Sequence, residues 1–247
     1  MPIDSWNALA VTTERSQQLI GLIDLTNLDD DGDQAAIDAL CAMAAEHHTA
    51  AVCVWPDFVA QASAALAGTG VRVATVVNFP TGDERAFATA NLATRCVDNG
   101  ADEIDVVLPY RAFMAGEFHR CDDVLRSARM ATAGTAHLKV ILETGELIDP
   151  HVIAAASGFA IDHGADFIKT STGKSPTSAT PAAVAIMLDA IAASDRTVGI
   201  KPSGGIRTVA DAERYLGLAE ERLGVGWPTP ETFRFGASGL LSALLDD

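Results

Sequence analysis

The lysines of this chain are few, and all of them lie in its second half. The sequence holds thirteen arginines spread along its length but only four lysines, Lys139, Lys169, Lys174 and Lys201. Each lies in or beside a short β-branched run. An arginine supplies surface charge as well as a lysine does, but only a lysine can lose its proton and act as a nucleophilic amine. We therefore expect the chain to use a primary amine in its chemistry.

An internal repeat relates two of these lysines to an aspartate. The segment GADEID at residues 100–105 recurs without a gap as GADFIK at residues 164–169, which aligns Asp105 with Lys169. Lys201 follows Lys169 at half that separation. If one strand and its connection form the repeating unit, the three residues occupy equivalent positions on three strands. Their side chains are then expected at one end of a sheet.

Two lysines on adjacent strands affect each other's protonation. Adjacent strands lie about 4.8 Å apart, so two ammonium groups there repel and one is pushed towards neutrality. A depression of three pKa units corresponds to about 4 kcal/mol, and a neutral amine forms an imine with a carbonyl substrate. The alternative is that the lysines are structural ions that snorkel from strand ends or pair with Asp105 and Glu143. The matched register of two lysines and one aspartate favours catalysis.

Glycine-rich turns follow the last three predicted strands, which are those of Lys169 and Lys201 and the final strand of the chain. They are STGK at residues 171–174, SGG at residues 203–205 and GASG at residues 236–239. Backbone N–H groups of such turns, with a helix N-terminus, form phosphate sites in barrels. The alternative is that a short turn simply needs glycine for positive φ. The predicted cradle consists of Gly173, Gly204, Gly205, Gly236, Ser238 and Gly239, with charge from Lys174 or Arg207.

The elements that must position these residues alternate regularly. Strands are predicted at residues 22–25, 51–54, 71–77, 103–108, 138–142, 167–170, 198–201 and 234–235. Helices are predicted at residues 34–46, 57–66, 84–99, 122–131, 150–163, 181–193, 208–223 and 239–245. Eight βα units in about 250 residues favour an α/β fold of the (β/α)8 TIM-barrel type, and an open doubly wound sheet is the alternative. Without a linker-like tract, residues 1–247 are predicted to form a single domain with a short N-terminal extension.

Composition narrows the classes of partner. The formal net charge of −16 argues against nucleic acid and anionic membranes, which are bound by broad basic patches. Met1–Trp6 lacks the basic start of a signal peptide, and no apolar run is long enough to span a bilayer. We therefore expect a soluble, cytoplasmic protein. Four cysteines without CxxC spacing predict free thiols, and the six histidines show no HxH or HExxH metal pattern.

Seven blocks, in order along nearly the whole chain, resemble the deoxyribose-phosphate aldolases, which are class I aldolases with a (β/α)8 barrel. The blocks are IDLT (23–26), NFP (78–80), GADEIDVVLPYRAFMAG (100–116), LKVILETGEL (138–147), FIKTSTGK (167–174), GIKPSGGIRT (199–208) and FRFGAS (233–238). The resemblance implies that Lys169 is the Schiff-base nucleophile and that Asp105 and Lys201 form a proton relay. The supporting residues of the family fall on Asp24, Cys53 and Lys139, although Cys53 is also compatible with merely lining the pocket.

The resemblance also implies a reaction and its partners. The expected activity is reversible cleavage of 2-deoxy-D-ribose 5-phosphate to D-glyceraldehyde 3-phosphate and acetaldehyde. The small phosphorylated sugar and acetaldehyde are then the partners, and no metal or other cofactor is expected. Homo-oligomer formation stays open.

Two departures and two alternatives accompany the resemblance. Ser203 stands where the family more often has alanine, and the sequence ends at Asp247 without the terminal tyrosine that assists proton transfer in some members. We expect these departures to affect rate and closure over substrate rather than the reaction type. One alternative is another phosphate-binding barrel enzyme, such as an isomerase or a keto-acid aldolase. The other is a sugar-phosphate sensor without turnover, which predicts loss of Asp105 or of one lysine.

Overall fold

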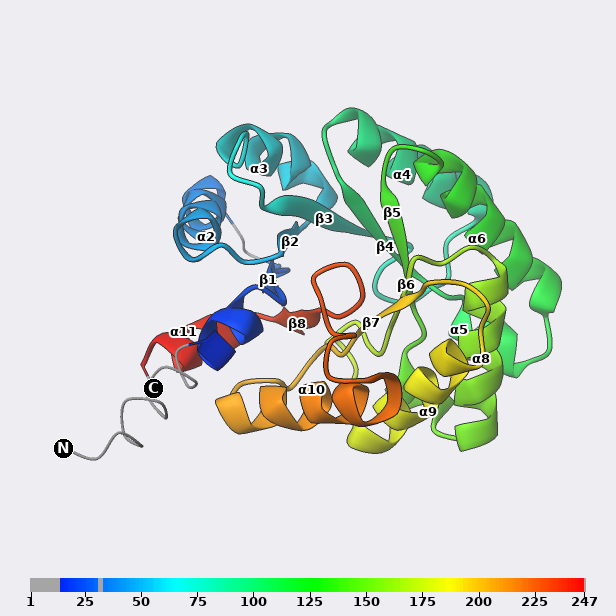
Figure 1. Ribbon diagram of the computed structural model, residues 1–247. Coiled ribbons are helices and arrows are strands. Elements are labelled where there is room, and N and C mark those ends of the chain that lie inside the picture. Colours follow the sequence, from blue (N-terminus) through cyan, green and yellow to red (C-terminus); the bar gives the residue numbers. More distant parts are fainter. Residues whose placement is uncertain (1–13, 31–32, 247) are drawn as a thin grey trace.

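Eight short parallel strands alternate with helices and form the inner ring of the structure (Figure 1). The computed structural model describes residues 14–30 and 33–246, which form one α/β domain. The strands are β1 (Ile23–Asn27), β2 (Ala51–Val54), β3 (Arg72–Val77), β4 (Glu103–Val107), β5 (His137–Ile141), β6 (Phe167–Lys169), β7 (Gly199–Lys201) and β8 (Phe235–Ala237). The predicted N-terminal extension begins in residues 1–13, which lie outside the described ranges.

The order of the strands decides between the two predicted architectures. The sheet runs β7-β6-β5-β4-β3-β2-β1-β8, so each strand lies beside its neighbour in the chain. The remaining seam, between β7 and β8, is made by two isolated parallel bridges, Ile200 with Phe233 and Ser203 with Gly236. The sheet therefore closes on itself. The predicted (β/α)8 barrel is confirmed, and the doubly wound alternative, whose strand order would reverse at a switch point, is wrong.

The helices surround the strand ring in Figure 1 and bury their apolar faces against it. They are α2 (Gln34–His47), α3 (Val59–Ala65), α4 (Ala86–Asp98), α5 (Tyr110–Met114), α6 (Phe118–Thr132), α7 (Thr144–Leu147), α8 (Pro150–Asp162), α9 (Pro181–Ala192), α10 (Val209–Leu223) and α11 (Leu240–Leu245), with a 3₁₀ turn, η1 (Pro56–Phe58), before α3. Residues 14–20 are also helical. The helices α2, α8, α9 and α10 begin at side-chain caps: in α9 the Thr180 hydroxyl accepts from the Ala183 N–H, and Pro181 follows in the first turn.

The structure corrects several predicted boundaries. The predicted helix at 57–66 begins as the 3₁₀ turn η1, because Pro56 lies in the first turn. The eighth strand is Phe235–Ala237 rather than 234–235. The short helices α5 and α7 were not predicted, since four or five residues cannot show a helical period.

The repeated GAD segments have the same structural role. Gly100 and Gly164 both adopt positive φ, 97° and 87°, where a helix ends and a strand is about to begin. Each following aspartate then accepts from the preceding strand: Asp102 Oδ2 from the Val73 N–H at 2.8 Å, and Asp166 Oδ2 from the Leu138 N–H at 2.7 Å. The repeat therefore marks two equivalent βα units, as the sequence indicated.

The interior of the barrel is divided between small apolar and long charged side chains. Ala51, Cys53, Ala74 and Val76, on β2 and β3, form an apolar cluster with Leu28. The neighbouring strands β1 and β4 contribute buried carboxylates, β5, β6 and β7 contribute buried lysines, and the buried Arg234 comes just before β8. Small residues on one side make room for long ones on the other, so the barrel interior is filled by side chains without a pore. This division places the charged groups next to one another.

Candidate active site

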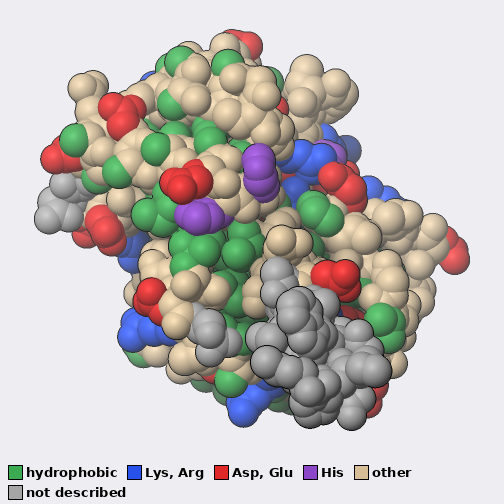
Figure 2. Space-filling view, turned by 60° about the vertical axis from the view of Figure 1, so that its left-hand side comes forward, with side chains coloured by type: hydrophobic (Ala, Val, Ile, Leu, Met, Phe, Trp, Pro, Cys, Tyr) green, Lys and Arg blue, Asp and Glu red, His purple; other side chains and the backbone are tan. Residues whose placement is uncertain are grey.

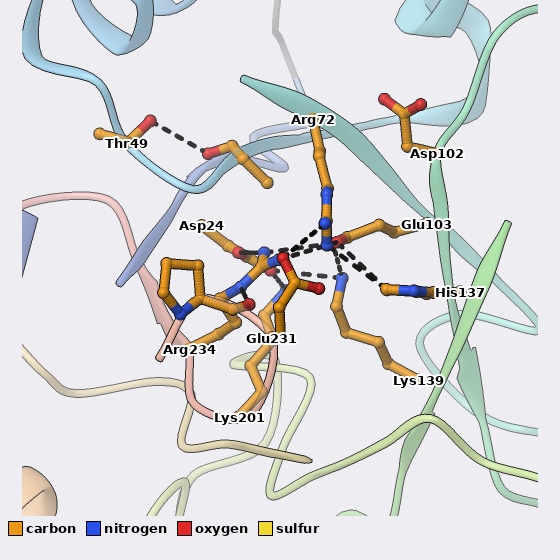
Figure 3. Close-up of polar contacts among 12 residues, drawn as sticks. Asp24, Thr49, Arg72, Asp102, Glu103, His137, Lys139, Lys201, Glu231 and Arg234 are labelled. Atoms are coloured by element: carbon orange, nitrogen blue, oxygen red, sulfur yellow. Dashed lines mark hydrogen bonds and ion pairs between the residues drawn. The ribbon is translucent and has the colours of Figure 1, made fainter. Parts of the chain in front are cut away.

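Seven buried charged side chains meet inside the barrel, and Figure 3 shows five of them. They are Asp24, Glu103, Asp105, Lys139, Lys169, Lys201 and Arg234, and none is more than 4% exposed. Buried ionic groups are costly unless they are paired. Here three carboxylates face four basic side chains, so one basic group has no carboxylate of its own. That excess is the central electrostatic feature of the site.

Asp105 lies at the centre of the lysines. Its Oδ2 is 2.8 Å from both Lys169 Nζ and Lys201 Nζ, and its Oδ1 is 3.0 Å from Lys139 Nζ. Lys169 and Lys201 are direct register partners on β6 and β7. Between β4 and β6 the strand tilt shifts the register by two residues, so Asp105 and Lys169 reach the same height although they are not register partners. The structure thus brings together the three residues that the repeat related.

The three lysines differ in the number of carboxylates around them. Lys139 contacts Glu103, Asp105 and Asp24, and Lys201 contacts Asp105 and Asp24. Lys169 contacts Asp105 alone.

Protonation follows this distribution. Burial lowers the pKa of Lys169 and the Lys201 ammonium lowers it further, so that Asp105, acting in the other direction, does not restore it. Burial also lowers the pKa of Lys201, but Asp105 and Asp24 outweigh burial and raise it above its ordinary value. The same holds for Lys139, which Asp105, Glu103 and Asp24 keep protonated. Lys169 is therefore the lysine that loses its proton most readily. Partial burial together with a second cation was the cause predicted from the sequence, and in the structure burial is the larger of the two.

The carboxylates are held in their charged form. Burial alone would raise the pKa of Asp105, but Lys139, Lys169 and Lys201 hold it well below its usual range. Asp24 behaves in the same way beside Lys201, Lys139 and Arg234. Its Oδ2 lies 2.6 Å from Lys201 Nζ, and its Oδ1 lies 2.6 Å from Arg234 Nη1. Asp24 therefore links the lysines to the arginine.

Two members of the cluster, Glu103 and Arg234, were not predicted from the sequence. Arg234 Nη2 donates to Glu103 Oε1 at 2.9 Å, and Glu103 Oε2 contacts Lys139 Nζ. Glu103 could have been found, because it precedes Asp105 by two residues on a strand and so points to the same face. Arg234 carries no comparable signal, since the sequence does not show what its side chain meets.

Cys53 and Lys139, which were predicted in supporting positions, both lie within the barrel. Cys53 is fully buried on β2, and its burial raises the pKa of its thiol, with Lys201 and Lys169 acting in the opposite direction. A neutral thiol at this place lines the cluster and carries no charge. Lys139 is engaged by three carboxylates, as described above.

A cavity of about 270 Å³ lies at the carboxyl ends of the strands, next to the charged cluster. Lys169 is the one lysine of the cluster that lines it. The other lining residues come from β1 and β8 and from the loops after β1, β6, β7 and β8: Thr26, Leu28, Asp29, Thr172, Gly173, Lys174, Ser203, Gly204, Gly205, Ile206, Arg207, Gly236, Ala237 and Ser238. All predicted cradle residues therefore line this cavity except Gly239, which precedes α11.

The rim of the cavity carries the positive charge that an anion would need. Gly204 and Gly205 have φ values of 82° and 78°, so their backbone turns in a way that favours glycine. Lys174 Nζ donates to the Leu28 carbonyl at 2.8 Å and lies 3.5 Å from Asp30. The side chain thus reaches from the β6 loop to the β1 loop across the mouth of the cavity.

A buried carboxylate holds the loop after β6. Glu143, in left-handed conformation with φ 59°, is 1% exposed. Its Oε2 accepts from the Thr172 hydroxyl at 2.5 Å and from the Thr172 N–H at 3.3 Å. Burial raises the pKa of Glu143, and the hydrogen bonds from Thr172 act against that rise. Glu143 therefore orders a loop of the cavity. It does not pair with the lysines, although the alternative interpretation of the sequence expected such a pair.

Within residues 14–30 and 33–246, no three or more His, Cys, Asp or Glu side chains are arranged to hold a metal ion. None of the helices described is both long and apolar enough to cross a membrane. On the face drawn in Figure 2, acidic side chains are scattered, and basic ones lie in separate groups rather than in one broad patch.

Comparison with known proteins shows the family to which this chain belongs. A family model described as DeoC/LacD family aldolase matches residues 18–241. A deoxyribose-phosphate aldolase of Agrobacterium fabrum is 49% identical over 236 residues, which cover 94% of this chain and 91% of that protein. Among solved structures, a protein assigned as a deoxyribose-phosphate aldolase from Coccidioides immitis gives a TM-score of 0.84 at 29% identity and covers 100% of this chain and 98% of its own. Another from Toxoplasma gondii ME49 gives 0.87 at 27% identity and covers 96% of both chains. By its sequence and its fold, this chain belongs to the DeoC/LacD family of aldolases.

Proposed function

We propose that this protein is a class I aldolase that reversibly cleaves 2-deoxy-D-ribose 5-phosphate to D-glyceraldehyde 3-phosphate and acetaldehyde. The observation that carries the proposal is the environment of Lys169. Its amine lines the cavity, contacts one carboxylate, and has a lowered pKa. A buried lysine of lowered pKa is suited to form an imine with a carbonyl substrate. The 49% identity to the Agrobacterium deoxyribose-phosphate aldolase supports the choice of substrate.

The proposed reaction begins with imine formation. Neutral Lys169 Nζ attacks C1 of the open-chain aldehyde, and loss of water leaves an iminium ion. A base removes the proton of the C3 hydroxyl, the C2–C3 bond breaks, and its electron pair moves towards the iminium nitrogen. Glyceraldehyde 3-phosphate leaves with its new carbonyl at the former C3. An enamine of acetaldehyde remains on Lys169.

The second half of the reaction returns the enzyme to its starting state. A proton is added to C2 of the enamine, and water then hydrolyses the iminium to acetaldehyde and free Lys169. Asp105 and Lys201 are the proposed proton-transfer groups, acting through a water molecule. Their 2.8 Å contact, the 2.8 Å contact of Asp105 with Lys169, and the register pairing of Lys201 with Lys169 support this role. In the iminium the positive charge on the nitrogen stays beside the Asp105 carboxylate.

The proposed phosphate site is the glycine-rich rim. Gly204, Gly205 and Ser238 line the same cavity as Lys169, and Lys174 and Arg207 supply positive charge. Backbone amides and basic side chains at this end of a barrel suit a phosphate group. An acidic protein with a net charge of −16 needs such a local site to bind an anion.

The proposed compartment is the cytoplasm. Cys41, Cys53, Cys96 and Cys121 are all buried free thiols. Unpaired cysteines are usual in a reducing compartment.

Borohydride trapping tests the proposal. The protein is incubated with 2-deoxyribose 5-phosphate, reduced with borohydride, and analysed by intact mass and peptide mapping. We expect one reduced adduct, located on Lys169, and its absence from Lys169→Met. Lys174→Met serves as a matched control that should keep the adduct while needing more sugar phosphate. An adduct on Lys201 would exchange the roles of the two lysines. Thermal stabilisation by the sugar phosphate without any adduct would favour the sensor.

A further inference from the structure

Arg234 is a buried cation that takes no direct part in the proposed reaction. Its guanidinium is enclosed between β1 and β4, 2.6 Å from Asp24 Oδ1 and 2.9 Å from Glu103 Oε1. Its Nε donates to the Pro230 carbonyl, and its guanidinium carbon lies 5.5 Å from the centre of the Phe167 ring. Arg234 does not line the cavity. Figure 3 shows the guanidinium between the two carboxylates.

We propose that Arg234 and Glu103 are positioning residues that determine which lysine of the barrel is deprotonated. The proposal rests on the imine chemistry of Lys169 proposed above. It assigns to the pair a task that neither residue could do by touching the substrate. They fix the counter-charges of Lys139 and Lys201, so that Lys169 is the lysine left with one carboxylate.

Arg234 binds one of the two carboxylate oxygens of Asp24. A carboxylate with both oxygens available could pair equally well with each of its two nearest lysines. Arg234 occupies Oδ1 of Asp24, and only Oδ2 remains for Lys201 at 2.6 Å and Lys139 at 3.4 Å. The guanidinium is planar and holds its partners in fixed directions. Arg234 thereby orients Asp24 towards Lys201.

Glu103 pairs with both Arg234 and Lys139. It contacts Arg234 with both oxygens, at 2.9 and 3.3 Å, and also binds Lys139. Lys139 is thus fully paired without drawing Asp105 away from Lys169 and Lys201. Arg72 Nη1 approaches Glu103 at 3.2 Å from the half-exposed rim, where Glu231 pairs with it at 2.6 Å.

The balance of charge in the buried cluster also disfavours a proton on Lys169. Asp24, Glu103 and Asp105 balance three cations, and Lys139, Lys201 and Arg234 are the three with the most carboxylate contacts. A proton on Lys169 would add a fourth positive charge inside the barrel. Burial and Lys201 lower the pKa of Lys169 accordingly. Removal of Arg234 would leave a carboxylate unbalanced, and a protonated Lys169 would then restore neutrality. Removal of the Glu103 charge would act in the opposite sense.

The titratable and charged groups that face this pair come from every strand but β8 and from one loop. They are Asp24 on β1, Cys53 on β2, Arg72 on β3, Glu103 and Asp105 on β4, His137 and Lys139 on β5, Lys169 on β6, Lys201 on β7 and Glu231 before β8. His137 lies 3.9 Å from Glu103 at the rim. Arg72, His137 and Glu231 are the partly exposed members, so their charges are screened by solvent and weigh less than the buried ones.

The test measures the protonation of Lys169 directly. Each variant is labelled with acetaldehyde and cyanoborohydride between pH 5 and 9, and the rate of labelling is followed on the Lys169 peptide. Acetaldehyde has no phosphate, so the result does not depend on the phosphate site. The rate should rise with pH towards a plateau, with a midpoint that reports the Lys169 amine. Melting temperatures verify that each variant is folded.

The two single variants should shift this midpoint in opposite directions. We expect Arg234→Met to raise it and Glu103→Gln to lower it, each by about one pH unit, because each removes one buried charge near the lysines. The double variant should return near the wild-type midpoint. Arg234→Lys keeps the charge and should stay close to wild type even if its labelling is slower. Arg129→Met is the matched control, because it breaks the 2.8 Å pair with Asp166 outside the cluster and should leave the midpoint unchanged.

Some results would overturn the inference. They are equal midpoints in all folded variants, shifts of the same sign in Arg234→Met and Glu103→Gln, or a shift in Arg129→Met as large as in Arg234→Met. If Arg234→Met does not fold, Arg234→Lys and Glu103→Gln decide alone, since one should keep the midpoint and the other should lower it. Failure of the wild type to label at Lys169 would instead remove the proposed function. The two failures are therefore distinguishable.

Discussion

Asp105 is the residue on which the three lysines of the barrel converge. Its two oxygens contact Lys139, Lys169 and Lys201 at 2.8 to 3.0 Å. A single carboxylate therefore contacts the proposed nucleophile and the other two lysines, and neutralises part of the buried positive charge. The three lysines differ in the number of carboxylates that each contacts, and sequence position alone does not show this difference.

Replacement of Asp105 by asparagine should affect both catalysis and stability. We expect Asp105→Asn to lower kcat/KM by about 10²- to 10⁴-fold, because a positioned proton-transfer group contributes about that much. We also expect a loss of about 3–5 kcal/mol of unfolding free energy, because removal of one partner leaves buried cations uncompensated. The release of glyceraldehyde 3-phosphate and thermal unfolding are the measurements. Asp122→Asn, which breaks the exposed pair with Arg126, is the control and should change neither. Wild-type turnover in Asp105→Asn would rule out the assigned role.

At the scale of elements, the loop after β6 depends on a residue after β5. Glu143 accepts two hydrogen bonds from Thr172, and Thr172, Gly173 and Lys174 line the cavity. The loop is thus held by a buried carboxylate rather than by its own turn.

Replacement of Glu143 should loosen this loop and weaken substrate binding. We expect Glu143→Ala to raise KM for the sugar phosphate about tenfold with a smaller change in kcat, since hydrogen bonds to charged groups contribute about 1.5–3 kcal/mol. Steady-state kinetics of cleavage is the measurement. Glu146→Ala, on the short helix α7 that Glu143 precedes, is the control and should keep the wild-type KM. An unchanged KM in Glu143→Ala would mean that the loop orders itself.

The β6–β7 pair also sets how closely side chains pack beneath the cluster. A Cβ atom on Gly199 would lie 2.3 Å from the Phe167 ring, which itself lies against Arg234. Gly199 is therefore required by a close approach and not by its backbone conformation.

A methyl group at position 199 should be destabilising. We expect Gly199→Ala to lower the unfolding free energy by about 1–3 kcal/mol through overpacking. Gly217→Ala is the matched control: Gly217 lies within α10 with no atom within 4 Å of an added Cβ. It should gain about 0.5–1 kcal/mol, since alanine is the better helix former. Urea unfolding of both variants is the measurement, and equal midpoints would contradict the expected packing.

At the scale of the whole molecule, stability depends on carboxylates that are buried and charged. Asp24, Glu103 and Asp105 all have pKa values below their ordinary range, because lysines and Arg234 outweigh the effect of burial. A carboxylate whose folded-state pKa lies below its unfolded value stabilises the fold above the unfolded value, and that stabilisation is lost as the pH falls. The barrel should therefore be sensitive to acid.

Acid unfolding tests this expectation. We expect the melting temperature to fall steeply as the pH drops below about 4, near the ordinary pKa values of Asp and Glu, because all three carboxylates then bind protons on unfolding. Glu103→Gln should show a shallower decline, since one of the three groups no longer titrates. Asp57→Asn, which removes an exposed carboxylate 3.9 Å from Arg95 and outside the cluster, should decline as the wild type does. A melting temperature that is independent of pH between 5 and 3 would contradict the depressed pKa values.

The sequence by itself determined the elements and the direction of their side chains. The eight strands were predicted close to their observed bounds, because short apolar runs and regular βα alternation are local signals. The GAD repeat placed Asp105 and Lys169 at equivalent positions, and the period of two along a strand directs both inwards. The resemblance of seven blocks then gave the family, which the comparisons confirm.

The tertiary structure decided which charges meet and how strongly. Arg234 contacts Glu103 across 131 residues of sequence, and it reaches Asp24 because β8, which follows Arg234, pairs with β1 and so brings the two ends of the chain together. The tilt of the strands, rather than their pairing, brings Asp105 level with Lys169. The loops also left Gly239 outside the cavity. Counter-charges inside a barrel depend on distances between strands far apart in the chain, and these distances exist only once the sheet has closed.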